Sequence, residues 1–255
     1  MSDIVIPSVP VPASRFNPRM ALFYSAPKVG KTTAAAALPN SLILELEPSG
    51  ADFLAARKID VPDVKTLLAV LEKLTALREA KTPACSRLVI DTVDALERMA
   101  GPWALDRYKS SVLGKDFKGT DLFELPMGAG YGRLRDAMGE LCWLFAKAAE
   151  EVILLAHVRD KYIERPGVQD VATADVDLTG KCRAIVLGRC SSIGYMRRDF
   201  ADNLFVNFKS SDTINCGSRC AHLTGKEILL GERKNGALVF HWSKIYLDTP
   251  PPPAP

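Results

Sequence analysis

The sequence lacks the segments that would carry it into or across a membrane. Its 255 residues contain no run of about 18 uncharged apolar residues, the length that a membrane helix requires. Residues 1–16 show neither the basic region nor the long apolar region of a signal peptide. The six cysteines are scattered along the chain, which predicts reduced thiols and no disulfide framework. We therefore expect a cytoplasmic protein with no membrane partner.

A large excess of one charge is also missing. Lys and Arg number 33 against 30 Asp and Glu, which gives a net charge of +3. This balance permits a nucleic-acid partner but does not require one. With 47% hydrophobic residues over this length, the chain can bury a full core and does not have the composition of a disordered protein.

Proline-rich ends enclose an ordered body. We expect residues 1–18 to be a flexible N-terminus, residues 19–248 to be the folded domain and residues 249–255 to be a polyproline tail. Apolar runs and periodicity predict strands at residues 20–24, 41–46, 87–91 and 151–158, and helices after residue 30 and at residues 64–79 and 134–150. This alternation predicts an α/β fold with a mostly parallel sheet and helices on both faces. Short strand-like pieces from about residue 191 predict antiparallel strands added at the C-terminal end.

The stretch YSAPKVGKTT at residues 24–33 has the order of a phosphate-binding loop, namely a strand, a loop ending in Gly-Lys-Thr and a helix. In such a loop, backbone amides surround the β-phosphate, the Lys31 ammonium reaches the β and γ oxygens, and the Thr32 hydroxyl ligates magnesium. The predicted nucleotide-binding residues are Ser25, Ala26, Pro27, Lys28, Val29, Gly30, Lys31, Thr32 and Thr33. Ser25 stands where the pattern expects glycine, which a serine tolerates if its φ stays negative. The alternative is a chance Gly-Lys-Thr in an ordinary turn.

A second motif, RLVIDTVD at residues 87–94, ends a predicted strand in Asp91. At the carboxyl edge of the sheet this carboxylate can hold magnesium through water, so the predicted metal residues are Thr32 and Asp91. Asp94 falls in the first turn of the next helix, where an acid is favoured for the sake of the helix alone. The residue after Asp91 is Thr92 and not the glutamate of many other P-loop ATPases, so a catalytic base must come from elsewhere.

Two other strand ends supply candidates for catalysis. Glu45 and Glu47 alternate onto one face of their strand, and Glu47 is nearer the carboxyl edge, so Glu47 is the candidate base. Its alternative is a solvated acid at a strand end. His157 closes the strand at residues 151–158 at the same edge, where it can read the γ-phosphate, or it can be a structural residue only. The predicted catalytic set is Glu47, Lys31 and His157.

Cys216, Cys220 and His222 have a Cys-x₃-Cys-x-His spacing that can contribute ligands to zinc. Only the distant Cys182 and Cys190 could complete four ligands, so zinc is the less favoured interpretation.

Two long segments, residues 108–133 and 159–183, follow the strands that end near Asp91 and His157. If both emerge on one side of the sheet, they form a basic rim for single-stranded DNA. The predicted DNA-binding residues are Lys115, Lys118, Arg133, Arg159, Lys161 and Arg165, with Lys109, Lys181 and Arg183 in the same segments. The aromatic residues predicted to stack on bases are Phe117, Phe123, Tyr131 and Tyr162. The alternative is a pair of solvated loops, because both segments also carry acids.

The segments APKVGKTT, LVIDTVD, PMGAGYGRLRDAM and LLAHVRDKY, together with Glu47, resemble in order and spacing the phage-encoded AAA-type ATPases with a RecA-like core that act as single-strand DNA annealing proteins. The resemblance covers roughly residues 19–231. It implies a RecA-like P-loop NTPase fold, ATP with Mg²⁺, single-stranded DNA as partner and a role in phage recombination in the host cytoplasm. It also implies Glu47 as the catalytic acid and His157 as the phosphate sensor. A homo-oligomer and a single-strand-binding protein are further expected partners.

Three classes of function therefore compete: a DNA-dependent recombination ATPase, a P-loop kinase of a small molecule, and a nucleotide-gated scaffold without DNA binding. The ATPase rate with and without single-stranded DNA separates them.

Overall fold

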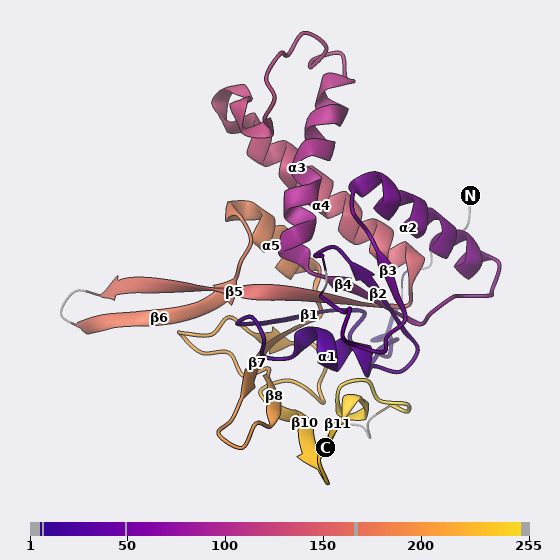
Figure 1. Cartoon of the computed structure of the whole chain (residues 1–255), viewed down its shortest axis with the longest axis vertical. Helices are drawn as coiled ribbons and strands as arrows, with labels where there is room; N and C mark the ends of the chain where they lie inside the picture. The colour runs from indigo at the N-terminus through magenta and orange to yellow at the C-terminus, as the bar shows by residue number, and fades with distance from the viewer. Residues whose placement is uncertain (1–5, 7, 49, 166–167, 251–255) are drawn as a thin grey trace.

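Parallel strands form the centre of the molecule, which the computed structural model describes over residues 6, 8–48, 50–165 and 168–250, with the backbone alone at residues 160–165 and 168–172. Within this described part, six neighbouring strands run parallel in the order β7-β1-β5-β4-β2-β3 (Figure 1). Their bounds are β1 Met20–Ser25, β2 Ser41–Glu45, β3 Lys58–Asp60, β4 Arg87–Asp91, β5 Glu151–Arg165 and β7 Ser192–Arg198. The predicted parallel sheet is confirmed, and the short edge strand β3 is an addition to it.

Antiparallel strands extend this sheet beyond β7 and beside β5. β8 pairs with β7, β10 with β8, and β11 with β10, as predicted for the pieces after residue 191, except that the first of these pieces is β7, which runs parallel to β1. β6 pairs with the outer part of β5 to form a hairpin that projects from the body of the molecule (Figure 1). The bounds are β6 Val168–Val176, β8 Leu204–Asn207, β9 Gly217–Ser218, β10 Glu227–Lys234 and β11 Ala237–Phe240.

Helices cover the two faces of the sheet unequally. One face carries α2 Val64–Glu79, α3 Val93–Lys109, α4 Ala129–Ala148 and α5 Gly180–Arg189, whereas the other carries α1 Lys31–Ala36 and the single turn η3 Trp242–Lys244 (Figure 1). Strand β1 contributes to both cores, because Met20, Leu22 and Tyr24 pack toward the first face and Ala21 and Phe23 toward the second. A continuous apolar strand is buried on both sides in this way.

The helix predicted at residues 134–150 begins earlier, at Ala129, and ends at Ala148. Its first turn is rich in glycine, which weakens helical propensity and hides the start in the sequence. Gly130 is required by packing, since a Cβ there would lie 2.1 Å from the carbonyl oxygen of Leu122. Leu122 belongs to a short turn, η1 Leu122–Glu124, which is followed by η2 Pro126–Gly128. Tertiary contact with η1 therefore extends the helix through a sequence that predicts a loop.

The two basic segments do not form one rim in a single subunit, contrary to the prediction. Residues 110–128 connect the far ends of α3 and α4, and we call this connection the helical tip (Figure 1). The segment after His157 is not a loop but the β5–β6 hairpin followed by α5. In Figure 1 the helical tip extends upward, whereas the hairpin extends to the left. The strand ends that carry them are close, but α3 and β5 then diverge.

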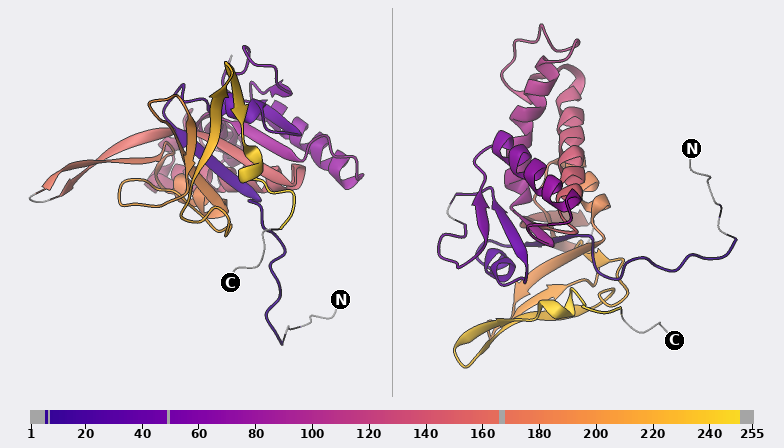
Figure 2. Two further views of the ribbon diagram at one scale, coloured as in Figure 1. Left: turned by 90° about the horizontal axis from the view of Figure 1, so that it is seen from below. Right: turned by 90° about the vertical axis from the view of Figure 1, so that its right-hand side faces the viewer.

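Residues 8–16 run away from the sheet without regular secondary structure, and residues 251–255 of the predicted tail lie outside the described residues (Figure 2). None of the helices in the described ranges combines the length and apolar character needed to cross a lipid bilayer.

Candidate active site

The predicted phosphate loop joins β1 to α1 at the carboxyl edge of the sheet. Ser25 is the last residue of β1 and does not adopt a positive φ, so the serine fits where the pattern expects glycine. Gly30 has a φ of 113° and precedes α1 as its N-cap, a conformation that favours glycine. Lys28 also adopts a left-handed conformation, with a φ of 65°. The loop therefore turns sharply at two points before the helix begins.

Lys31 extends its side chain back under this loop. Its Nζ lies 3.3 Å from the carbonyl oxygens of Ser25 and Ala26 and from the Ser25 hydroxyl. Burial lowers the pKa of Lys31, although the negative charges of Asp91, Asp94 and Glu47 partly oppose that effect. Within the described residues, no carboxylate forms an ion pair with Lys31 at contact distance. A buried ammonium with only neutral partners is suited to an anionic ligand.

Thr32 and Asp91 bring a hydroxyl and a carboxylate together, although they are far apart in sequence. The Thr32 Oγ1 donates to Asp91 Oδ2 at 2.6 Å. Burial raises the pKa of Asp91, and the nearby Glu47 adds to that rise, whereas the bond from Thr32 and the charge of Lys31 lower it. A hydroxyl and an acidic oxygen are hard donors of the kind that Mg²⁺ takes. The residues present therefore fit a magnesium ion.

Glu47 and Glu45 have different environments, although both border the same cleft. β2 ends at Glu45, so strand alternation does not extend to Glu47. Glu45 accepts from the Ala51 amide and from Lys58 Nζ, each at 2.6 Å, and is buried. Those contacts make Glu45 a structural anchor for the turn that follows β2.

Glu47 accepts hydrogen bonds at one carboxylate oxygen, while its other oxygen has no hydrogen-bond partner among the described residues. Its Oε1 accepts from Thr92 Oγ1 at 3.0 Å and from Arg98 Nη2 at 3.2 Å. Thr92 and Arg98 were not predicted from the sequence. The i,i+4 spacing of Asp94 and Arg98 could have indicated Arg98 in the sequence, since α3 places both side chains on one face.

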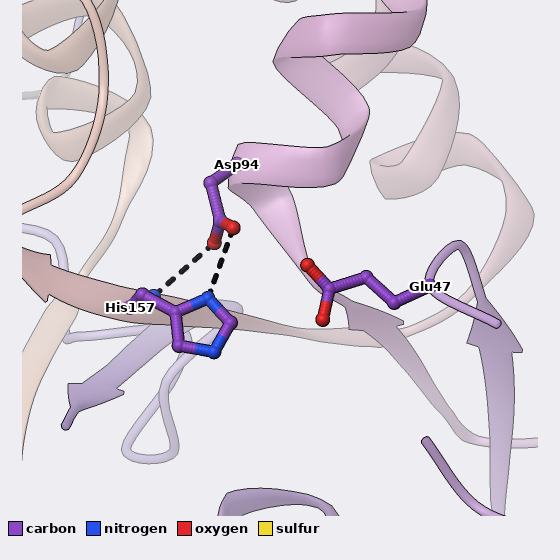
Figure 3. A group of neighbouring side chains, drawn as sticks. All are labelled: Glu47, Asp94 and His157. Carbon is purple, nitrogen blue, oxygen red and sulfur yellow. Dashed lines mark hydrogen bonds and ion pairs between the residues drawn. The ribbon is translucent and has the colours of Figure 1, made fainter. Parts of the chain in front are cut away.

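Asp94 and His157 form a pair beside Glu47 (Figure 3). Asp94 accepts from the His157 backbone amide at 3.1 Å, and its Oδ2 lies 3.0 Å from His157 Nδ1. Burial works against ionisation of Asp94, but the hydrogen bonds from His157 outweigh it and lower the pKa of Asp94. With a proton assigned to Nδ1, Nε2 is the ring nitrogen that has no hydrogen-bond partner in the described part of the chain. Asp94 is therefore more than a helix-start acid, because it fixes the ring of His157.

These side chains border one cleft of about 340 Å³. The lining residues are Pro27, Lys28, Gly30, Lys31, Thr32, Thr33, Glu45, Glu47, Gly50, Asp91, Thr92 and His157. Ser25, Ala26 and Val29 belong to the loop but do not line the cleft. The structure thus brings the phosphate-loop motif, the acid at the end of β4, Glu47 and His157 together.

The predicted DNA-binding residues are divided between the helical tip and the hairpin. Lys115, Lys118 and Arg133 are exposed at or near the tip, and Arg133 lies over the Tyr108 ring at 5.5 Å. On the hairpin, the Arg159 Nε lies 3.9 Å from Asp177 Oδ1. The side chains of Lys161 and Arg165 lie outside the described residues, as does that of Tyr162.

Several other members of these segments have partners within the chain. Arg183 on α5 forms an ion pair with Asp175, which reduces its availability to a ligand. Phe117 packs edge-on against Tyr108 at 5.9 Å, whereas Phe123 and Tyr131 contact each other at 4.9 Å and stay about half exposed. Phe123 of the helical tip and Tyr131 in the first turn of α4 therefore remain accessible.

The cysteines and histidine weighed for zinc do not gather. Cys216 and Cys220 are buried free thiols, and His222 Nε2 lies 2.9 Å from the carbonyl oxygen of Ile245. Among the described side chains, the grouping of potential metal ligands that does occur is Glu47, Asp94 and His157. Arg98 contacts both acids of that group and supplies the positive charge there.

The parallel sheet, the loop between β1 and α1, and the cleft at the carboxyl edge define an α/β P-loop NTPase core with antiparallel strands at its C-terminal end. The family model of the AAA domain matches residues 17–220, and the chain belongs to that family. It is therefore an AAA-type P-loop protein of the nucleotide-hydrolysing class. No curated protein matches the sequence.

Proposed function

We propose that this protein is a Mg²⁺-dependent ATPase that binds single-stranded DNA and promotes annealing or strand pairing in phage recombination. The observation that carries the ATPase part is the meeting of Lys31, Thr32, Asp91, Glu47 and His157 around one cleft. The recombination part is supported by the family resemblance and by the connection between the cleft and the hairpin.

In this proposal, different side chains of the cleft have different roles in hydrolysis. Lys31 binds the β and γ oxygens of ATP, and Thr32 and Asp91 hold Mg²⁺. Mg²⁺ supplies charge neutralisation of the phosphates when it is bound. The available oxygen of Glu47 orients the attacking water and takes its proton, while Thr92 and Arg98 hold the other oxygen. This assigns Glu47 the role of base and leaves Glu45 in its ion pair with Lys58.

His157 reads the γ-phosphate through Nε2. When both ring nitrogens carry a proton, Nδ1–H donates to Asp94 and Nε2–H can donate to a γ-phosphate oxygen, so that this second bond would pull on a side chain that cannot rotate freely. His157 lies on β5, the strand that continues into the hairpin. Loss of the γ-phosphate would thus remove a contact to β5 at the point where the hairpin leaves the sheet.

Further contacts connect the base of the hairpin to the cleft. The Asp177 amide, just after β6, donates to the carbonyl oxygen of His157 at 2.9 Å. The hydroxyl of Tyr24, the residue before Ser25 in β1, lies 3.2 Å from the carbonyl oxygen of Ala174 in β6. The end of β6 is therefore held by His157 and by Tyr24, which lie at or next to the proposed nucleotide site, and this supports coupling between nucleotide and hairpin.

The hairpin carries Arg159, Lys161 and Arg165, which we assign to DNA phosphates. The helical tip carries Lys115 and Lys118, with Arg133 close to it in α4, and it extends in a different direction from the hairpin of the same subunit (Figure 1). A shared DNA groove would therefore need the tip of one subunit beside the hairpin of another, which makes a homo-oligomer part of the proposal. A single-strand-binding protein is a further proposed partner, as the resemblance implies.

The test measures ATP hydrolysis with and without single-stranded DNA, and DNA affinity with an ATP analogue, with ADP and with no nucleotide. Separate variants address the hairpin, Lys161→Ala with Arg165→Ala, and the helical tip, Lys115→Ala with Lys118→Ala. Lys65→Ala with Lys73→Ala is the matched control, because both lysines are exposed on α2 and their loss removes the same charge.

We expect DNA to stimulate hydrolysis and the ATP analogue to strengthen DNA binding. The hairpin variant should weaken DNA binding and flatten its salt dependence, by about 0.7 in slope for each lost phosphate contact, while the control behaves as the wild type. Hydrolysis without any DNA binding would refute the recombination proposal and favour the nucleotide-gated scaffold. Phosphate transfer to a small molecule in place of water would favour a kinase.

A further inference from the structure

Arg198, the last residue of β7, reaches the phosphate loop from a neighbouring strand. β7 pairs in parallel with β1, with Tyr195 beside Tyr24, so both strands end at the same edge of the sheet. The Arg198 Nε donates to the carbonyl oxygen of Val29 at 2.7 Å. Its Nη1 donates to the carbonyl oxygen and to Oδ1 of Asp202, at 2.7 and 2.9 Å. The guanidinium is thus held between the turn after β7 and the phosphate loop.

The contact with Val29 determines how the next peptide group is oriented. The Val29–Gly30 peptide is trans, so its carbonyl and its N–H point in opposite directions. Holding the Val29 carbonyl toward Arg198 therefore turns the Gly30 N–H away from Arg198. In a phosphate loop this N–H is one of the donors to the β-phosphate.

Gly30 and Arg198 also fit each other sterically. A Cβ on Gly30 would lie 2.8 Å from Arg198 Nη2, so the guanidinium occupies the space that any other residue at position 30 would fill. Gly30 has a φ of 113°. An unconstrained glycine adopts this value only as one of many accessible backbone conformations. Arg198 selects one of these conformations through the bond to Val29 and the contact with Gly30.

We propose that Arg198 is a positioning residue that holds the Val29–Gly30 peptide in its phosphate-binding orientation, so that the loop does not have to reorganise when a nucleotide binds. This inference rests on the proposed nucleotide site. The arginine is supported in turn by the C-terminal strands, because Asp202 also lies 3.3 Å from Arg233 Nε on β10. The antiparallel extension of the sheet thereby acts on the phosphate loop through Asp202 and Arg198.

The test compares Arg198→Ala and Arg198→Lys with the matched control Arg197→Ala. Arg197 is the preceding residue of the same strand, and its guanidinium pairs with Glu227 at 2.8 and 2.9 Å, not with the loop. ADP affinity is measured by equilibrium titration, and KM and kcat for ATP by steady-state hydrolysis. Thermal unfolding shows which variants are folded.

We expect Arg198→Ala to weaken ADP binding and raise KM by about 10- to 100-fold, as the loss of a charged hydrogen bond would, with kcat at saturating ATP changed much less. Arg197→Ala should bind ADP as the wild type does. Arg198→Lys keeps the charge but cannot bridge Val29 and Asp202 with a planar fork, so it should fold normally and still bind ADP weakly.

Wild-type ADP affinity in folded Arg198→Ala would overturn the inference. If that variant does not fold, wild-type affinity in Arg198→Lys would overturn it equally. Lys31→Ala distinguishes an error about Arg198 from an error about the nucleotide site. If Lys31→Ala also binds ADP with wild-type affinity, the nucleotide site itself is wrongly placed. A lower kcat with unchanged KM would also contradict a positioning role in nucleotide binding.

Discussion

Replacing Asp94 by asparagine tests whether this buried acid orients His157. The carboxylate accepts two hydrogen bonds from one residue, from the His157 amide at 3.1 Å and from the ring Nδ1 at 3.0 Å. Asparagine has the same size but a single acceptor oxygen, so one of the two donors would face an NH₂ group. The Asp94 side chain is 8% exposed, and water has little access to repair the loss.

The size of the effect follows from these contacts. A hydrogen bond to a charged group contributes about 1.5–3 kcal/mol, and in a domain of this size each kcal/mol shifts Tm by about 2–4 °C. We therefore expect Asp94→Asn to unfold about 3–12 °C below the wild type at neutral pH. The control is Asp106→Asn, an exposed acid on the same helix, which should leave Tm nearly unchanged.

The pH dependence gives a second measurement of the same contact. Hydrogen bonds from His157 lower the pKa of Asp94 in the folded state. The stability that they contribute is therefore complete above the unfolded pKa of about 4 and is lost as the pH falls through the lower folded value. The difference between wild type and Asp94→Asn should be constant above pH 5 or so and narrow in stronger acid. Equal stability at neutral pH, or a gap that widens in acid, would refute this account of the pair.

The remaining predictions concern the cleft. Lys31→Ala should abolish ATP binding in a folded protein, because it removes the buried cation that faces the phosphates; unchanged affinity by equilibrium titration would contradict the site. Glu47→Gln should bind ATP and Mg²⁺ but hydrolyse about 10²- to 10⁴-fold more slowly, whereas Glu45→Gln should act mainly on stability through the ion pair with Lys58; normal turnover in Glu47→Gln would move the base elsewhere. Asp91→Asn should raise the Mg²⁺ concentration needed for half-maximal hydrolysis, and an unchanged Mg²⁺ requirement would exclude Asp91 as a ligand. Because burial raises the pKa of Asp91, the Mg²⁺ affinity of the wild type should begin to fall, as the pH is lowered, at a higher pH than it would with an exposed aspartate.

The sequence by itself determined the sheet and the position of the phosphate loop. Buried parallel strands are continuous apolar runs, and those at residues 20–24, 41–46, 87–91 and 151–158 could be located because each has an uninterrupted apolar stretch, although β5 then continues beyond its run to Arg165. The carboxyl ends of parallel strands share one edge, so the residues after each run could be expected to meet. Asp91 and His157 were found in this way.

Only the tertiary structure decided the roles of residues whose contacts come from other parts of the fold. Glu45 and Glu47 look equivalent in the sequence, but Lys58 on β3 engages one of them and Thr92 and Arg98 engage the other. The start of α4 depends on how closely Gly130 approaches Leu122, which no local propensity encodes. The two basic segments diverge because the strand that holds His157 continues straight into the hairpin, whereas α3 extends away from the sheet toward the top of the view (Figure 1). Arg198 reaches the phosphate loop because β7 lies beside β1, and a neighbour in the sheet that is far away in sequence leaves no local pattern from which to predict it.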